Sequence, residues 1–173
     1  MIYLDSAAVV KLVHAEPESQ ALRDWLTERA DVGWVSSVLV EVESFRALAR
    51  YTPEAVTRLH PVLDLIDLVD LDPGIRILAQ TITPATVRSL DAIHLAAALR
   101  LRGQLTSFVT YDKRLADAAA VAGLTVDAPT EERRTGESQA AEGIAEFRAA
   151  VEGSGASSGE GGGAWARDEL HER

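Results

Sequence analysis

Short apolar segments alternate with helical segments throughout residues 1–129, and this alternation restricts the possible folds more than any single motif does. The apolar run at residues 2–4 ends at Asp5-Ser6, and the run at 107–110 is followed closely by Asp112. Asp and Ser commonly begin helices, so each run is typical of a buried strand that leads into a helix. Strands that alternate with helices predict an α/β fold, in which a parallel sheet is covered by helices on both faces.

The same patterns predict the individual elements. We expect strands at residues 2–4, 33–37, 66–71, 107–110 and 124–126. We expect helices at residues 7–14, 38–50, 75–82, 91–101 and 113–121, one that begins at Pro17, and one that runs from Pro53 to about residue 65. The helix at 75–82 ends before Pro84, because the residue before a proline disfavours helical geometry.

Residues 130–173 differ in composition from the rest of the chain. They contain ten acidic and five basic residues, and residues 153–163 have the sequence GSGASSGEGGG, which is typical of a flexible linker. Such a segment has too few apolar residues to bury a core of its own. We therefore expect one domain at residues 1–129 and an acidic, Gly/Ser-rich tail at 130–173 that is largely disordered or docks on another surface.

The chain carries a formal net charge of −10 and contains no cysteine. A net-acidic protein is not a general binder of phosphate backbones, so contact with a nucleic acid requires something that offsets its carboxylates, such as a divalent cation. The absence of cysteine excludes disulfides and thiolate zinc sites and fits a reducing cytosol. The first residues do not resemble a signal peptide, and no apolar run reaches the roughly 20 residues of a membrane span. We expect a cytoplasmic protein without membrane contact.

Four acidic residues fall at the ends of predicted strands or in the helical turns beside them: Asp5, Glu43, Asp91 and Asp112. Asp5 and Asp112 each follow a predicted strand, and the carboxyl ends of parallel strands form the edge of a sheet where sites are built. Asp91 opens a predicted helix, and Glu43 lies one to two turns into another. These four residues are the candidate catalytic and metal-binding set.

Carboxylates gathered at one edge of a sheet supply the oxygen ligands that Mg²⁺ and Mn²⁺ prefer. Two such ions about 4 Å apart activate a water and stabilise the leaving oxygen when a phosphodiester bond is cleaved. The hydroxyls of Ser6 and Thr110, which stand beside two of the acids, are candidates to orient that water. The pattern favours metal-dependent phosphodiester hydrolysis.

Each of these residues also has an ordinary structural interpretation. Asp is a preferred N-cap, so each of the three aspartates is consistent with a helix cap alone, and the hydroxyls of Ser6 and Thr110 also suit caps. Glu43 taken by itself is typical of a solvated helix surface, and Glu41 beside it competes for the same role. Only the joint pattern points to a metal site.

Other polar residues carry weaker signals. His94 lies one turn after Asp91, but a lone histidine on an apolar helix is more often packed or hydrogen-bonded than catalytic. Five basic residues are candidates to meet nucleic-acid phosphates, with an ordinary surface charge as the alternative for each: Lys11, Arg46, Arg50, Lys113 and Arg114. No phosphate-binding glycine loop, nucleophile elbow or dinucleotide fingerprint appears in the sequence.

Four segments together resemble a known family. They are residues 2–12 (IYLDSAAVVKL), 36–47 (SSVLVEVESFRA), 90–98 (LDAIHLAAA) and 108–115 (FVTYDKRL). In this order and spacing they resemble PIN-domain ribonucleases, in particular the VapC-type toxins of bacterial type II toxin–antitoxin pairs. The resemblance covers roughly residues 1–128 and implies a compact three-layer α/β/α sandwich with a central parallel sheet.

The resemblance also implies an activity, which is Mg²⁺- or Mn²⁺-dependent endonucleolytic cleavage of RNA. The four acids of the family fall, in order, on Asp5, Glu43, Asp91 and Asp112, and the hydroxyl that precedes the fourth acid falls on Thr110. Glu43 matches better than Glu41, because the family's acid stands three residues before an Arg-Ala pair, here Arg46-Ala47. In this comparison Asp5 and Asp91 are the main metal ligands, and the other two acids complete the site directly or through water.

The partners that the resemblance implies are an RNA substrate, a cognate antitoxin protein and a second copy of the chain. Such toxins usually end near Pro129, whereas this chain continues for 44 residues. Antitoxins of this type often place an acidic or arginine-bearing segment along the toxin, so residues 164–173 are a candidate for the same role, with Arg167 or Arg173 near the carboxylates. Two alternatives remain: a catalytically silent PIN-fold binding or regulatory module, and another metal-dependent phosphohydrolase such as one that acts on DNA flaps.

Overall fold

The computed structural model describes residues 1–131 of the chain. The strands in this part are β1 (Ile2–Leu4), β2 (Trp34–Ser37), β3 (Ile66–Val69), β4 (Ser107–Val109) and β5 (Val126–Asp127). The helices are α1 (Ser6–Val13), α2 (Ser19–Thr27), α3 (Leu39–Tyr51), α4 (Leu59–Leu63), α5 (Pro73–Gln80), α6 (Ser89–Arg100) and α7 (Lys113–Val121). A short 3-10 helix, η1 (Pro53–Arg58), precedes α4.

The five strands form one parallel sheet in the order β3-β2-β1-β4-β5. β1 is the central strand, with Tyr3 paired to Val35 of β2 on one side and to Phe108 of β4 on the other. The backbone amide of Asp5 continues this pairing by donating to the carbonyl of Val109 at 3.2 Å. Asp5 therefore leaves the sheet at the middle of its carboxyl edge.

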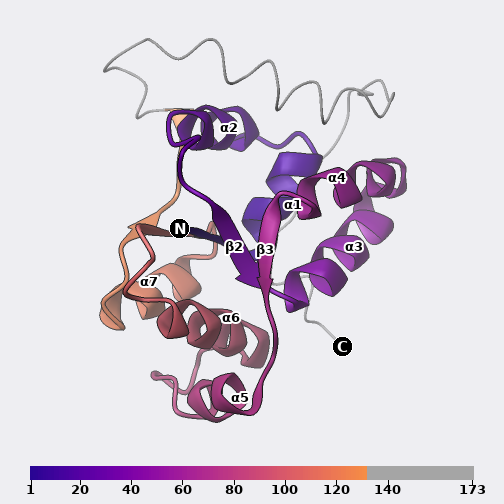
Figure 1. The fold of residues 1–173 in the computed structure, drawn as a ribbon. Helices are drawn as coiled ribbons and strands as arrows, with labels where there is room; N and C mark the ends of the chain where they lie inside the picture. Colours follow the sequence, from indigo (N-terminus) through magenta and orange to yellow (C-terminus); the bar gives the residue numbers. More distant parts are fainter. Residues whose placement is uncertain (132–173) are drawn as a thin grey trace.

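Helices cover both faces of the sheet, and the alternation of side chains along β1 shows why. Ile2 and Leu4 point into the core that is formed with α1, α2, α3 and α4. Tyr3 points to the opposite face, into the core that is formed with α5, α6 and α7. Figure 1 shows α5, α6 and α7 on one side of the sheet, with α1, α3 and α4 on the other. The predicted α/β/α sandwich with a central parallel sheet is confirmed.

Two of the three candidate aspartates do cap helices. Asp5 is the N-cap of α1 and its Oδ1 accepts from the amide of Ala8 at 2.8 Å. Asp112 is the N-cap of α7 and its Oδ1 accepts from the amide of Leu115 at 3.0 Å. The capping interpretation is wrong for Asp91. The N-cap of α6 is Arg88, whose backbone is extended, and Asp91 is the third residue of the helix.

The segment after Pro53 differs from the single helix that the sequence predicts. It forms η1 over Pro53–Arg58 and then begins again as α4. Pro61 gives the reason: a proline lacks the amide that a helix interior needs, but the first turn of a helix leaves that amide unsatisfied anyway. A new helix that begins at Leu59 places Pro61 in its first turn.

Three further boundaries differ by a few residues. α2 begins two residues after Pro17, and α5 begins at Pro73 because the side chain of Asp72 caps it. β5 begins at Val126, two residues later than expected. Gly123, which follows α7, adopts a φ of 82°. This left-handed conformation favours glycine and commonly ends a helix.

The predicted tail lies outside the described residues, apart from Thr130 and Glu131. The hypothesis for residues 164–173, with Arg167 and Arg173, concerns that undescribed part, and the domain boundary near residue 129 stays a prediction. Within residues 1–131, no helix has the length and apolar character needed to cross a membrane.

Candidate functional site

Asp5 is the central residue of the candidate site and is completely buried. Its two carboxylate oxygens have different partners. Oδ1 caps α1 through the amide of Ala8, and Oδ2 accepts a 2.6 Å hydrogen bond from the hydroxyl of Thr110. The cap fixes the orientation of the carboxylate at the carboxyl edge of the sheet, so capping and a site role are compatible in this residue.

Thr110 joins the two strand ends that carry Asp5 and Asp112. Its hydroxyl donates to Asp5 and accepts from the backbone amide of Asp112 at 3.1 Å. Thr110 is 1% exposed, and Asp112 is half-buried. The structure therefore brings Asp5, Thr110 and Asp112 together at neighbouring strand ends, as the positions of β1 and β4 in the sheet predict.

Glu43 is buried, although its sequence context alone favoured a solvated helix surface. It is 7% exposed, whereas Glu41 on the same helix is exposed. Oε2 of Glu43 accepts a short hydrogen bond from the hydroxyl of Ser6 and lies 2.6 Å from Nε2 of His94. Glu43 rather than Glu41 thus occupies the interior, which agrees with the choice made from the Arg-Ala spacing.

His94 connects Glu43 to the central strand. The ring is completely buried, and its Nδ1 lies 2.8 Å from the hydroxyl oxygen of Tyr3, which accepts the amide of Ser37 at 3.0 Å. Burial raises the pKa of the Tyr3 phenol well above its ordinary value, so the hydroxyl keeps its proton. The interpretation of His94 as a packed and hydrogen-bonded residue is confirmed, and Tyr3 is a member of this network that the sequence reasoning missed.

Ser6, His94 and Glu43 do not form a nucleophilic triad. Such a triad needs the serine at one imidazole nitrogen and the acid at the other. Here Oγ of Ser6, at 3.2 Å, and Oε2 of Glu43, at 2.6 Å, face the same Nε2. Ser6 is also completely buried, so its hydroxyl serves to hold Glu43.

Asp91 occupies the first turn of α6 and is 2% exposed. A carboxylate in the first turn of a helix interacts favourably with the helix dipole. Asp91 and His94 are three residues apart and so share one face of α6. Because His94 contacts Glu43, Asp91 lies on the side of α6 that faces α3.

The donor chemistry of these residues suits a hard divalent cation. Asp5, Glu43 and Asp91 are all at most 7% exposed, and burial of several carboxylates is costly unless positive charge compensates them. Oxygen ligands of this kind are those that Mg²⁺ and Mn²⁺ prefer. Within residues 1–131, no three His, Asp or Glu side chains are grouped as a ready-made ion site. Convergence of all four acids on one ion therefore stays a prediction.

The basic residues divide into two kinds. Lys11 is neither a candidate for phosphate contact nor an ordinary surface charge, because it is 7% exposed and donates to Glu16 and Glu18. The other four are exposed: Arg46, Arg50, Lys113 and Arg114. Arg46 and Arg50 lie on α3, the helix that carries Glu43, so exposed positive charge stands on a helix that also contributes an acid to the site.

Comparison with known proteins identifies the class. Residues 2–121 match the PIN domain, and this range contains all four candidate acids. The chain belongs to the PIN-domain family.

Three relatives define the type within that family. Ribonuclease VapC35 of Mycobacterium tuberculosis strain H37Rv is 44% identical over 135 residues, which is 77% of this chain and 100% of the relative. Ribonuclease VapC47 of strain CDC 1551 is 45% identical over 132 residues, 75% of this chain and 97% of the relative. Ribonuclease VapC46 of strain H37Rv is 44% identical over 129 residues, which is 75% of this chain and 98% of the relative. The resemblance to VapC-type PIN ribonucleases is confirmed.

Proposed function

We propose that this protein is a divalent-metal-dependent endoribonuclease and the toxin of a bacterial type II toxin–antitoxin pair. The observation that carries the proposal is the burial of Asp5, Glu43 and Asp91 in a PIN domain, with Asp5 at the carboxyl edge of its sheet. Relatives at 44–45% identity are named as VapC ribonucleases. Endonucleolytic cleavage of RNA accounts for both the buried acids and the similarity to these ribonucleases.

Four acids would hold the cation, directly or through water: Asp5, Glu43, Asp91 and Asp112. An all-oxygen donor set is typical of Mg²⁺ or Mn²⁺ sites rather than of softer metals. When bound, such an ion lowers the pKa of water and stabilises the leaving oxygen of a phosphodiester.

The residues of the chain itself have distinct tasks in this proposal. Thr110 and the amide of Ala8 fix the two oxygens of Asp5. Ser6 and His94 hold one oxygen of Glu43. The exposed Arg46 is a candidate for contact with RNA phosphates near the site. These contacts preorganise the carboxylates, which is the main contribution that a protein makes to metal-assisted hydrolysis.

The proposal extends to the protein's partners and location. A cognate antitoxin holds the toxin inactive, and the chain forms a homodimer and acts in the cytoplasm. The type of relative supports the antitoxin, and the cysteine-free sequence supports a reducing compartment.

Cleavage of total RNA by the purified full-length protein tests the proposal, with Mg²⁺, with Mn²⁺ and with EDTA, followed by mapping of the RNA ends. We expect discrete cuts that need a divalent metal and disappear in Asp91→Asn and Glu43→Gln. Glu41→Gln is the matched control, because Glu41 is exposed on the helix that carries Glu43. Absence of cuts by folded wild-type protein would contradict the proposal and favour the silent binding module.

A further inference from the structure

We propose that His94 is a positioning residue that orients the carboxylate of Glu43 for the cation, and that Tyr3 holds His94 in place for this task. The inference rests on the proposed function, because it assigns a part of the same site. Its basis is a continuous chain of buried contacts from Ser37 through Tyr3 and His94 to Glu43.

The first step is the contact between His94 and Glu43. Nε2 lies 2.6 Å from Oε2, and an ionised carboxylate only accepts hydrogen bonds, so Nε2 carries the proton and donates it. A hydrogen bond to a charged acceptor in a buried site is stronger than a neutral one. His94 is 0% exposed and Glu43 is 7% exposed, so water does not compete freely for this contact.

The second step is a second donor to the same oxygen. The hydroxyl of Ser6 also donates to Oε2, so both donors, Ser6 and His94, hold the same oxygen of Glu43. Two donors on one oxygen restrict rotation of the carboxylate and so fix its orientation on α3.

The third step is the brace behind the imidazole. Nδ1 of His94 lies 2.8 Å from the Tyr3 hydroxyl oxygen, which the amide of Ser37 also contacts, so the ring is held at both nitrogens. The Tyr3 ring stacks on Phe108 with centroids 5.0 Å apart and an interplanar angle of 13°. It meets the imidazole edge-on at 5.9 Å. Because Tyr3 belongs to the central strand, the orientation of Glu43 on α3 is set by the sheet.

Two substitutions at His94 separate positioning from packing. The amide nitrogen of Gln in His94→Gln approximates Nε2 and retains a donor for Glu43. The shorter Asn in His94→Asn approximates Nδ1, which retains the contact to Tyr3 and loses the donor. A residue that only fills space would tolerate or reject both substitutions alike. Tyr3→Phe keeps the stacking on Phe108 and removes only the hydroxyl.

The experiment measures Mn²⁺ binding by calorimetry without RNA, and then kcat and KM for RNA cleavage. We expect His94→Asn to weaken Mn²⁺ binding about 10- to 100-fold and to lower kcat with little change in KM, as is usual when a residue that orients a metal ligand is lost. We expect His94→Gln to stay much closer to wild type, and Tyr3→Phe to fall between them. His60→Asn, at an exposed histidine, is the matched control.

Thermal unfolding in EDTA completes the test. Equal losses in His94→Asn and His94→Gln that follow their melting temperatures would contradict the inference, because packing alone explains such a result. Wild-type Mn²⁺ affinity in His94→Asn would contradict it as well. If His94→Asn does not fold, the comparison of Tyr3→Phe with wild type decides, and unchanged Mn²⁺ affinity there overturns the inference. Wild-type protein that neither binds Mn²⁺ nor cleaves RNA contradicts the proposed function itself.

Discussion

The hydroxyl of Thr110 donates a 2.6 Å hydrogen bond to Oδ2 of Asp5, and so joins two residues that are 105 positions apart in the chain. The hydroxyl oxygen of Thr110 in turn accepts a hydrogen bond from the backbone amide of Asp112 at 3.1 Å. One side chain thereby ties the end of β4 to the end of β1 and the start of α7. The candidate site depends on this contact, because Asp5 and Asp112 follow different strands, β1 and β4.

Loss of the Thr110 hydroxyl should disturb the site more than the fold. In Thr110→Val, which preserves the volume, Oδ2 of Asp5 loses the hydrogen bond from Thr110 and the Asp112 amide loses its contact with the Thr110 hydroxyl. We expect a loss of about 1–3 kcal/mol in the free energy of unfolding and a decrease of tenfold or more in RNA cleavage. Thr110→Ser should retain most of both. Urea denaturation and cleavage assays on the two variants check this, and equal activity of the Val and Ser variants would refute it.

Asp112 permits a separation of its cap from its proposed metal role. Asn is as good an N-cap as Asp, whereas replacement by Ala costs about 1 kcal/mol. We expect Asp112→Asn to unfold at nearly the wild-type urea concentration but to lose RNA cleavage, and Asp112→Ala to lose both. If Asp112→Asn cleaves RNA normally, Asp112 serves only as the cap that its contact with Leu115 already shows.

Binding of a divalent cation should stabilise the folded protein. A ligand at one hundred times its Kd adds about 2.7 kcal/mol to the free energy of unfolding. We expect Mn²⁺ to raise the melting temperature of wild type, and to raise it far less in Asp5→Asn, whose side chain still offers an oxygen to cap α1. Asp117→Asn, at an exposed acid on α7, is the control and should respond as wild type does. An equal Mn²⁺ response in Asp5→Asn would exclude Asp5 as a ligand.

The parts of the site that the sequence predicts are those that follow from local pattern. A buried strand that ends at Asp5, and a second that ends near Asp112, are visible in short apolar runs followed by cap residues. The choice of Glu43 over Glu41 follows from its place three residues before Arg46-Ala47, but its burial on α3 is not predicted, because a lone glutamate on a helix is typical of a solvated surface. Parallel pairing then places both strand ends at one edge of the sheet.

Contacts between distant parts of the chain are the features that the sequence could not predict. Tyr3 and His94 are 91 residues apart, and either residue alone is typical of an ordinary core position. The residues near Asp91 predict a possible cap there, because nothing in them marks Arg88 as the start of α6. The sequence likewise gives no sign that Lys11 is buried, because its partners lie in the irregular segment after α1.

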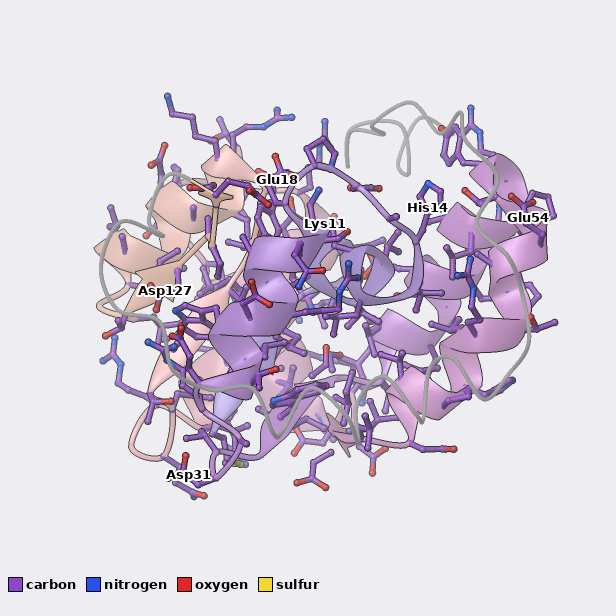
Figure 2. The ribbon with its side chains drawn as sticks, turned by 90° about the horizontal axis from the view of Figure 1, so that it is seen from above. Lys11, His14, Glu18, Asp31, Glu54 and Asp127 are labelled. Atoms are coloured by element: carbon purple, nitrogen blue, oxygen red, sulfur yellow. The ribbon has the colours of Figure 1, made fainter. Side chains whose placement is uncertain are left out.

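Lys11 anchors the irregular segment after α1, which contains Glu16 and Glu18, from within the fold. Its ammonium donates to Glu16 and, at 2.7 Å, to Glu18, and lies 4.8 Å from the ring centroid of Tyr111, beside the loop that carries Asp112. Figure 2 shows Lys11 and Glu18 directed toward one another. The side chain of Glu16 is only 2% exposed, so loss of Lys11 leaves a buried charge without its cation.

We expect Lys11→Met to lower the free energy of unfolding by about 3 kcal/mol, since the removal of one partner from a buried ion pair typically costs 3–5 kcal/mol. The double variant Lys11→Met/Glu16→Gln should recover part of that loss, because Gln leaves no charge to bury. Lys113→Met, at an exposed lysine, should change stability by less than about 0.5 kcal/mol. Urea denaturation of the three proteins measures this, and failure of the double variant to recover would show that packing of the lysine stem dominates.

Glu18 should make the free energy of unfolding depend on pH under acidic conditions. The hydrogen bond from Lys11 is the main cause that lowers the pKa of Glu18 below its ordinary value of 4.5. A carboxyl whose pKa is lower in the folded state stabilises the protein fully above the unfolded-state value, and this contribution is lost as pH falls below 4.5 toward the folded-state value. Wild type should therefore exceed Glu18→Gln in stability at neutral pH, and the difference should shrink below pH 4.5. Urea midpoints of both proteins across that range measure the difference. A difference that stays constant with pH would mean that the carboxylate of Glu18 gains nothing from Lys11.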